Sequence, residues 1–292
     1  MLPHCVALLV LVSGFVLAQV SAPNSFSQPS AYGLRDTELV QAYPPISVIT
    51  HPLAQEQMGP DRALQVYQER VRFQTQHLGG YSAAVVVRAQ LAGIGQQGEY
   101  ALECQYAAPR SLRFTPLHYA GDAFVKSNVI MRLLQSEADH VQKGDEDGMA
   151  IIPTNYSFSY RGTIKLDGRM VHDYEVRPRK KRKGLFRGHI YLDVFTGTLA
   201  RTEGHLVKVP SLFVKTVQFV QDYADFGEFS FPVHLHSSAH TRVIGPAVVD
   251  VYSGGYQPMS LNSTSPTYRF LTIDDGRDAG ESWMVGRAKP DP

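Results

Sequence analysis

Polar and apolar residues alternate along most of the chain between residues 157 and 253. The clearest stretch runs from Ser157 to Leu166, where the two kinds of residue follow one another almost without a break. A period of two places each kind on its own face of a β-strand. Seven such stretches follow one another, so the sequence predicts an antiparallel meander with one polar and one apolar face.

Turn residues separate these stretches and set their order. Asp167-Gly168 lies between the first two and is typical of a tight hairpin, because its central residues need positive φ. Pro178 and the basic segment after it end the second stretch, Thr196-Gly197 follows the third, and Pro210 ends the fourth. The predicted strands are 157–166, 169–177, 185–194, 199–209, 214–223, 229–235 and 241–251.

Two helices and three further strands are predicted in front of the meander. The first helix runs from Asp61 to about Leu78 and is closed by Gly79-Gly80; the second spans 122–137. The three strands are 81–91, 98–106 and 111–118. Two helices cannot cover so wide a sheet, and such sheets curl. We therefore expect a mainly β (α+β) fold, an incomplete, strongly curved antiparallel β-barrel with helices covering the concave face.

The first 18 residues are typical of a cleaved secretory signal peptide. Their apolar run, from Cys5 to Ala18, is too short for a stable membrane span and ends in Val16-Leu17-Ala18. An uncleaved anchor is the alternative. Cleavage leaves Cys104 as the only cysteine, so an intramolecular disulfide is excluded and packing must stabilise the fold.

The rest of the chain predicts one domain between two less regular segments. Residues 19–60 are rich in Ser, Pro and Gln, residues 61–256 hold the helices and strands, and residues 257–292 form a polar tail. Lys and Arg number 28 against 27 Asp and Glu, a formal net charge of +1. This balance leaves no footprint for nucleic acid as a partner of the whole molecule.

The layout, together with the stretches Tyr174 to Pro178, Gly184 to Asp193 and Phe231 to Val233, resembles the bacterial outer-membrane lipoprotein-sorting family. That family includes the periplasmic lipoprotein carrier, its receptor and related envelope-stress sensors. The resemblance implies an incomplete barrel with a helical lid, a periplasmic location, and acyl chains or acylated lipoproteins as partners. It covers about residues 61 to 256, and the chain is longer than the carrier.

Apolar side chains of the first two meander strands are the candidate cavity lining, and those of the second helix are the candidate lid. The lining set is Phe158, Tyr160, Ile164, Met170, Tyr174 and Val176, and we expect Tyr160 and Ile164 to share one face. The lid set is Val125, Val129, Leu133 and Leu134. The alternative is an ordinary core in which these residues pack against the helices.

A basic segment and a group of histidines are further candidates. Arg179, Lys180, Lys181, Arg182 and Lys183 could contact anionic headgroups and a membrane surface, although a charged turn is most often only solvated. His234, His236 and His240 could hold a metal, but no acidic or Cys ligand is fixed beside them in sequence.

The sequence has no catalytic or phosphate-binding motif, so it predicts neither an enzyme nor a cofactor. Three functions remain open. The first is an exported carrier of lipid or lipoprotein. The second is a periplasmic lipid sensor that regulates envelope stress, and the third is a metal-dependent enzyme that uses His234 and His236.

Overall fold

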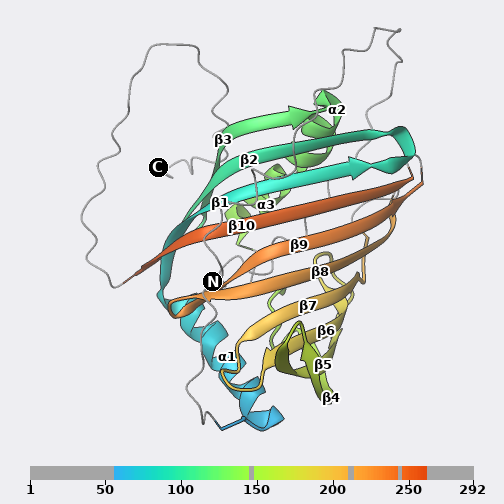
Figure 1. The fold of residues 1–292 in the computed structure, drawn as a ribbon. Helices are drawn as coiled ribbons and strands as arrows, with labels where there is room; N and C mark the ends of the chain where they lie inside the picture. Colours follow the sequence, from blue (N-terminus) through green and yellow to red (C-terminus); the bar gives the residue numbers. More distant parts are fainter. Residues whose placement is uncertain (1–55, 145–147, 210–213, 243–244, 262–292) are drawn as a thin grey trace, which may run out of the picture.

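The protein is described by a computed structural model that covers residues 56–144, 148–209, 214–242 and 245–261. In these ranges the chain forms one antiparallel ten-stranded sheet with the order β3-β2-β1-β10-β9-β8-β7-β6-β5-β4. The sheet is not closed, because β3 and β4 are its two edges. It curves around the helices, which lie behind it in the view of Figure 1. The expected fold class is confirmed.

The elements follow in the predicted order of helix, three strands, helix and seven strands. The helices are α1 (Pro60–His77), α2 (Ala123–Val125) and α3 (Met131–Lys143), with a π-helical turn, η4 (Lys126–Ile130), between the last two and a 3-10 turn, η3 (Ala92–Ile94), after the first strand. The strands are β1 (Leu78–Leu91), β2 (Gln96–Ala107), β3 (Ser111–Gly121), β4 (Tyr156–Leu166), β5 (Arg169–Pro178), β6 (Phe186–Asp193), β7 (Leu199–Leu206), β8 (Val214–Phe226), β9 (Phe229–Thr241) and β10 (Pro246–Ser260).

Strand β1 joins the front of the chain to its end, because it pairs with β2 on one side and with β10 on the other. Val87 pairs with Tyr100 and with Val251, so the three side chains share the concave face. Inward residues of nearly every strand and of both long helices form one buried cluster. The alternation seen in the sequence therefore produces a single core on the concave side.

Element ends differ from the prediction at three places. Helix α1 ends at His77, and Leu78 and the two glycines after it already belong to β1. The second helix continues past Glu137 to Lys143, where Gly144 adopts φ 68° and donates to the carbonyls of His140 and Val141. Strand β10 runs to Ser260, beyond the expected domain end at 256. The predicted signal peptide, residues 1–18, lies outside the described residues.

A β-bulge in β4 overturns one expectation about the faces of the sheet. Tyr160 pairs with Tyr174, but the register shifts at Arg161, so that Ile164 pairs with Val171. Because paired residues point to the same side, Tyr160 lies on the concave face and Ile164 on the convex one. The expectation that Tyr160 and Ile164 share a face was wrong, since one extra residue inverts the alternation.

Among the described helices, none combines the length and the apolar character that a membrane crossing requires.

Candidate functional site

The concave face between α3 and the first half of the sheet carries the candidate lipid-binding surface. Strands β1, β2, β3, β9 and β10 contribute the floor, and Leu133, Leu134 and Glu137 of α3 contribute the roof. The floor residues are Tyr81, Ala83, Val85, Val87, Cys104, Leu112, Phe114, Pro232, Val251, Ser253 and Tyr256. The free space between roof and floor is about 30 Å³. That is room for about one water molecule, so α3 fills the concavity in this conformation.

Polar side chains also line this mostly apolar pocket, among them Glu137 and Cys104. Glu137, on α3, is 3% exposed, and Cys104, on β2, is 5% exposed. Burial, and after it the charge of Glu137, raises the pKa of the Cys104 thiol to about 12. The helix therefore places a carboxyl group against the mostly apolar floor.

The lining residues predicted from the sequence lie at the other end of the concave face, beside α1. Tyr174 is buried and its hydroxyl donates to the carbonyl of Pro60 at 2.5 Å. Val176 is fully buried, Phe158 and Met170 are half-buried, and Tyr160 is 46% exposed on the edge strand. These five share the concave side, whereas Ile164 is 40% exposed on the convex side.

The predicted lid residues Val125, Val129, Leu133 and Leu134 are all buried against the sheet, and the last two line the pocket. The prediction missed the floor under them, which β1, β2 and β10 supply. The alternation from Tyr81 to Leu91 and from Tyr100 to Tyr106 carried the signal. This alternation does not reveal that β1 pairs with β10.

The convex face carries polar side chains in rows that cross the strands. In one row Asp222, on β8, pairs with His234, on β9, which stacks on Tyr252 of β10 with ring centroids 4.6 Å apart. In the next row His236 donates through Nδ1 to the carboxylate of Asp250 at 2.8 Å. Two carboxylates therefore lie beside the histidines, which the sequence did not reveal, because both come from neighbouring strands.

These groups do not form a metal site within the described residues, since no cluster of three His, Cys, Asp or Glu side chains has suitable geometry there. His234 lies between two carboxylates, 3.6 Å from Asp222 and 3.5 Å from Asp250. His240 lies on the same strand, paired with Pro246. The arrangement is a ladder of His–Asp contacts and stacked rings across the sheet.

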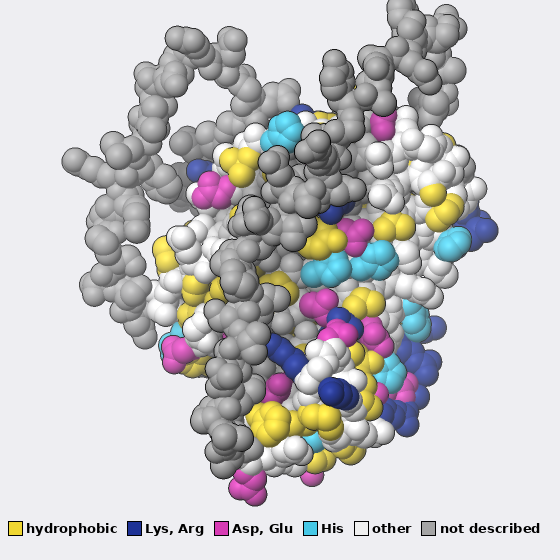
Figure 2. Space-filling view, viewed as in Figure 1, with side chains coloured by type: hydrophobic (Ala, Val, Ile, Leu, Met, Phe, Trp, Pro, Cys, Tyr) yellow, Lys and Arg dark blue, Asp and Glu magenta, His cyan; other side chains and the backbone are white. Residues whose placement is uncertain are grey.

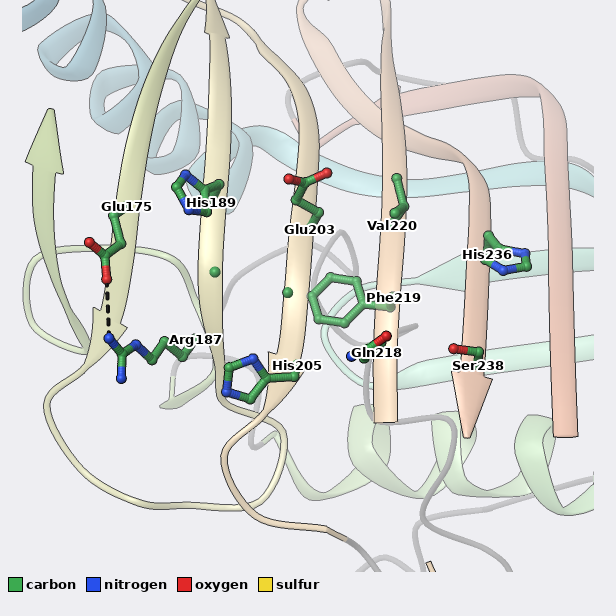
Figure 3. A pocket seen from close by; sticks show the side chains of 12 residues that line it. Glu175, Arg187, His189, Glu203, His205, Gln218, Phe219, Val220, His236 and Ser238 are labelled. Carbon is green, nitrogen blue, oxygen red and sulfur yellow. Dashed lines mark hydrogen bonds and ion pairs between the residues drawn. The ribbon is translucent and has the colours of Figure 1, made fainter. Parts of the chain in front are cut away.

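A hollow of about 680 Å³ lies on the convex face over β5 to β9. Figure 3 shows its residues: Glu175, Arg187, His189, Glu203, His205, Gln218, Val220, His236 and Ser238 point toward the viewer, and the ring of Phe219 lies between the strands. Gly188 and Gly204 pair at its centre. A Cβ on either glycine would collide with backbone of the other strand, so the close pairing of β6 with β7 depends on both.

Glu175 forms ion pairs with three arginines at one end of this hollow. Arg161 contacts Oε2, and Arg177 and Arg187 approach Oε1 at 2.5 Å and 3.4 Å. Hydrogen bonds from Arg177 and Arg161 lower the pKa of Glu175 to about 2. One carboxylate thus faces three guanidinium groups, and positive charge remains in excess.

The basic segment Arg179 to Lys183 connects β5 to β6 and is exposed throughout. Arg179 donates to the carbonyl of Pro153 at 2.7 Å. Figure 2 shows Lys and Arg side chains gathered at the lower right edge of the convex face, on the side of β4 to β6.

Comparison with known proteins gives structural matches alone. No family model matches the chain, and no curated protein does. A putative outer membrane lipoprotein-sorting protein domain from Vibrio parahaemolyticus matches with 13% identity and a TM-score of 0.36, over 71% of this chain and 95% of that one.

Two further structures are similar in the same loose way. A DUF1329 family protein from Desulfovibrio piger has 12% identity and a TM-score of 0.37, over 68% of this chain and 92% of that one. A LolA superfamily protein from Nitrosomonas europaea has 8% identity and a TM-score of 0.32, over 69% and 94%. The lipoprotein-sorting family that the sequence resembles is therefore among the matches. Functional inference rests on the side chains of this chain.

Proposed function

We propose that the protein binds the acyl chains of lipids or lipoproteins on its concave face, and that it does so in the periplasm as part of envelope lipid or lipoprotein traffic. The observation that carries the proposal is the continuous apolar inner surface, which spans the sheet and is covered in its β3 to β9 half by one short helical segment. Burial of an acyl chain contributes about 0.8 kcal/mol per methylene group.

Acyl chains enter, in this proposal, when the segment from α2 to α3 moves off the sheet. The closed pocket of about 30 Å³ holds no chain, so the roof and the ligand compete for one floor. Glu137 places a desolvated carboxyl group in this mostly apolar contact, and the cost of its desolvation offsets part of the free energy that the apolar contacts of the roof contribute. In this proposal α3 covers the floor when no ligand is bound, and an acyl chain can displace it.

The basic segment Arg179 to Lys183 contacts anionic lipid headgroups in this proposal. Each exposed cation near an anionic surface contributes about 1 kcal/mol of attraction. The contact would hold the carrier at a membrane during transfer. No catalytic step and no cofactor is assigned to the chain.

The test compares Glu137→Leu with Gln135→Leu. Gln135 lies on the exposed side of the same helix, so its replacement adds the same side chain without touching the pocket. We expect Glu137→Leu to raise the free energy of unfolding, because an apolar side chain of similar size replaces a carboxyl group that is desolvated in a mostly apolar pocket. The roof is then harder to displace, and binding of a fluorescent fatty acid should weaken several-fold. Gln135→Leu should change neither quantity.

Two failures are distinguishable. Purified wild-type protein that carries no lipid by mass spectrometry and takes up no fluorescent fatty acid would refute lipid binding itself. Lipid uptake that Glu137→Leu leaves unchanged, despite a stabilised fold, would keep the function and refute displacement of α3.

A further inference from the structure

Four hydrogen-bond donors stand in one row across the convex hollow. Arg187 on β6 pairs with His205 on β7, His205 pairs with Gln218 on β8, and Gln218 pairs with Ser238 on β9. Paired residues point to the same face, and neighbouring strands lie about 4.8 Å apart, so the row extends over roughly 14 Å. Figure 3 shows the four side chains side by side along one end of the hollow.

This donor row, defined as Arg187, His205, Gln218 and Ser238, contains no carboxylate. The acidic side chains stand in the adjacent row, two residues along each strand, where Glu175, His189, Glu203, Val220 and His236 follow one another. Those acids already have partners: Glu175 binds arginines, and Glu203 accepts from the hydroxyl of Tyr191 at 2.7 Å. The charge of Glu175 is therefore compensated by arginines, whereas Glu203 keeps its charge and is held by a neutral hydroxyl.

The donors of the row are not committed to strong internal bonds. The contact from Arg187 to Glu175 is 3.4 Å, longer than the 2.5 Å contact from Arg177 to the same oxygen. His205 is exposed, and among the described residues it makes no hydrogen bond or ion pair. The guanidinium and imidazole groups can therefore turn to an anion without breaking a short ion pair.

The hollow has the size and the polarity of a site for a small polar ligand. Its volume of about 680 Å³ is within the range of small-molecule sites, and its rim is charged or polar. The backbone of Gly188 and Gly204 forms part of its floor.

We propose that the donor row binds a phosphate-bearing polar ligand. A phosphate group offers three or four acceptor oxygens, which can accept from the guanidinium, imidazole, amide and hydroxyl donors of the row at once. A carboxylate has two oxygens and can accept from fewer of these donors. The five cations of the 179–183 segment, which leads into the strand of Arg187, raise the positive potential at that end. The phosphate belongs either to a lipid headgroup or to a free phosphorylated molecule, and the site lies on the opposite side of the sheet from the acyl-binding surface.

The test measures binding of two probes to the whole chain and to three variants. Pyrophosphate is the soluble probe, and its binding is measured by calorimetry. Vesicles of phosphatidylcholine with phosphatidylglycerol are the membrane probe, and their binding is measured by co-flotation. Arg187→Gln with His205→Gln removes the charged donors. Arg88→Gln is the matched control, because Arg88 is an exposed convex-face arginine paired with Glu99, outside the hollow. Lys180→Gln with Lys181→Gln separates the basic segment from the row.

We expect the Arg187/His205 variant to lose at least tenfold in affinity for the probe that binds, and Arg88→Gln to stay within twofold of wild type. Binding of pyrophosphate alone supports a free phosphorylated ligand, and binding of vesicles with loss in the Arg187/His205 variant supports a headgroup. Vesicle binding lost only in the Lys180/Lys181 variant overturns the proposal, as does equal loss in Arg88→Gln or absence of binding to both probes. Circular dichroism of each variant shows that it is folded. The proposal does not depend on acyl binding, so either can fail alone.

Discussion

At the scale of single residues, Glu175 offers a test of how charge stabilises the convex face. Its carboxylate contacts three arginines, and its pKa is lowered to about 2. A lowered folded-state pKa stabilises the protein fully above the unfolded-state value of 4.5, and this contribution is lost as pH falls from there through about 2. We expect Glu175→Gln to lower the melting temperature at pH 7, and the difference from wild type to shrink below pH 4.5.

Thermal melts from pH 7 to pH 2.5 measure this difference. Glu99→Gln is the control, because Glu99 pairs with the single arginine Arg88. A gap between Glu175→Gln and wild type that stays constant down to pH 2.5 would contradict the prediction.

The bulge at Arg161 predicts opposite effects for two similar substitutions. Ile164→Asp should change the free energy of unfolding by less than about 0.5 kcal/mol, since Ile164 is 40% exposed on the convex side. Val176→Asp should cost more than about 3 kcal/mol or prevent folding, since Val176 is fully buried. Urea denaturation of both variants gives the comparison, and comparable destabilisation by both would mean that the register is wrong.

The sequence alternation predicted the face of most side chains but not of Ile164. Gly162, with φ 144°, follows the extra residue in the bulge, and a glycine inside the strand pattern from Ser157 to Leu166 was the one local signal of it. The donor row had no local signal. Arg187, His205, Gln218 and Ser238 are scattered along the sequence, and only the register of four strands brings them together.

At the scale of elements, the end of α3 controls how firmly the roof is held. Gly144 closes the helix with φ 68°, a conformation that costs other residues about 1 kcal/mol. Gly227, with φ 65°, occupies the turn between β8 and β9 and has open space around it. We expect Gly144→Ala and Gly227→Ala each to destabilise the protein by about 1 kcal/mol or more, but only Gly144→Ala to loosen the roof.

Modification of Cys104 by a thiol reagent measures that loosening. The thiolate is the reactive form, and a pKa of about 12 together with burial under α3 keeps the native thiol inert at pH 8. In a Cys5→Ser chain, Gly144→Ala should speed modification severalfold, Glu137→Leu should slow it, and Gly227→Ala should leave local opening unchanged. Modification that proceeds only at the rate of global unfolding in every variant would exclude separate movement of the roof.

Most elements were predictable because their signals are local. Turn residues such as Asp167-Gly168 and the helical spacing from Val125 to Leu134 each act within a few residues. The start of β1 was missed because Gly79 and Gly80 look like a helix stop, yet the strand already begins at Leu78, which pairs with Ser260 of β10. Tertiary pairing decided that boundary.

At the scale of the whole molecule, β10 holds the two parts of the sheet together. It lies between β1 and β9 and makes long ladders with both. A chain that ends at Gly245 should therefore fail to melt cooperatively, whereas a chain that ends at Leu261 should melt as the full chain does. Circular dichroism of the two truncations tests this, and a cooperative melt of the shorter one would show that the remaining strands suffice.

Pairing of the first strand with the last also sets the order in which the protein can acquire its shape. Arg88 pairs with Asp250, so the chain between the two paired strands forms a loop that contains most of the described residues. Closure of so large a loop is entropically slow, and folding rates fall as contacts become more distant in sequence. Strands β1 to β3 and helix α1 cannot complete their packing until β10 is available to pair with β1. A polypeptide with this topology remains incompletely folded until β10 has been synthesised. Its apolar surface and unpaired strand edges are exposed to aggregation for the same interval.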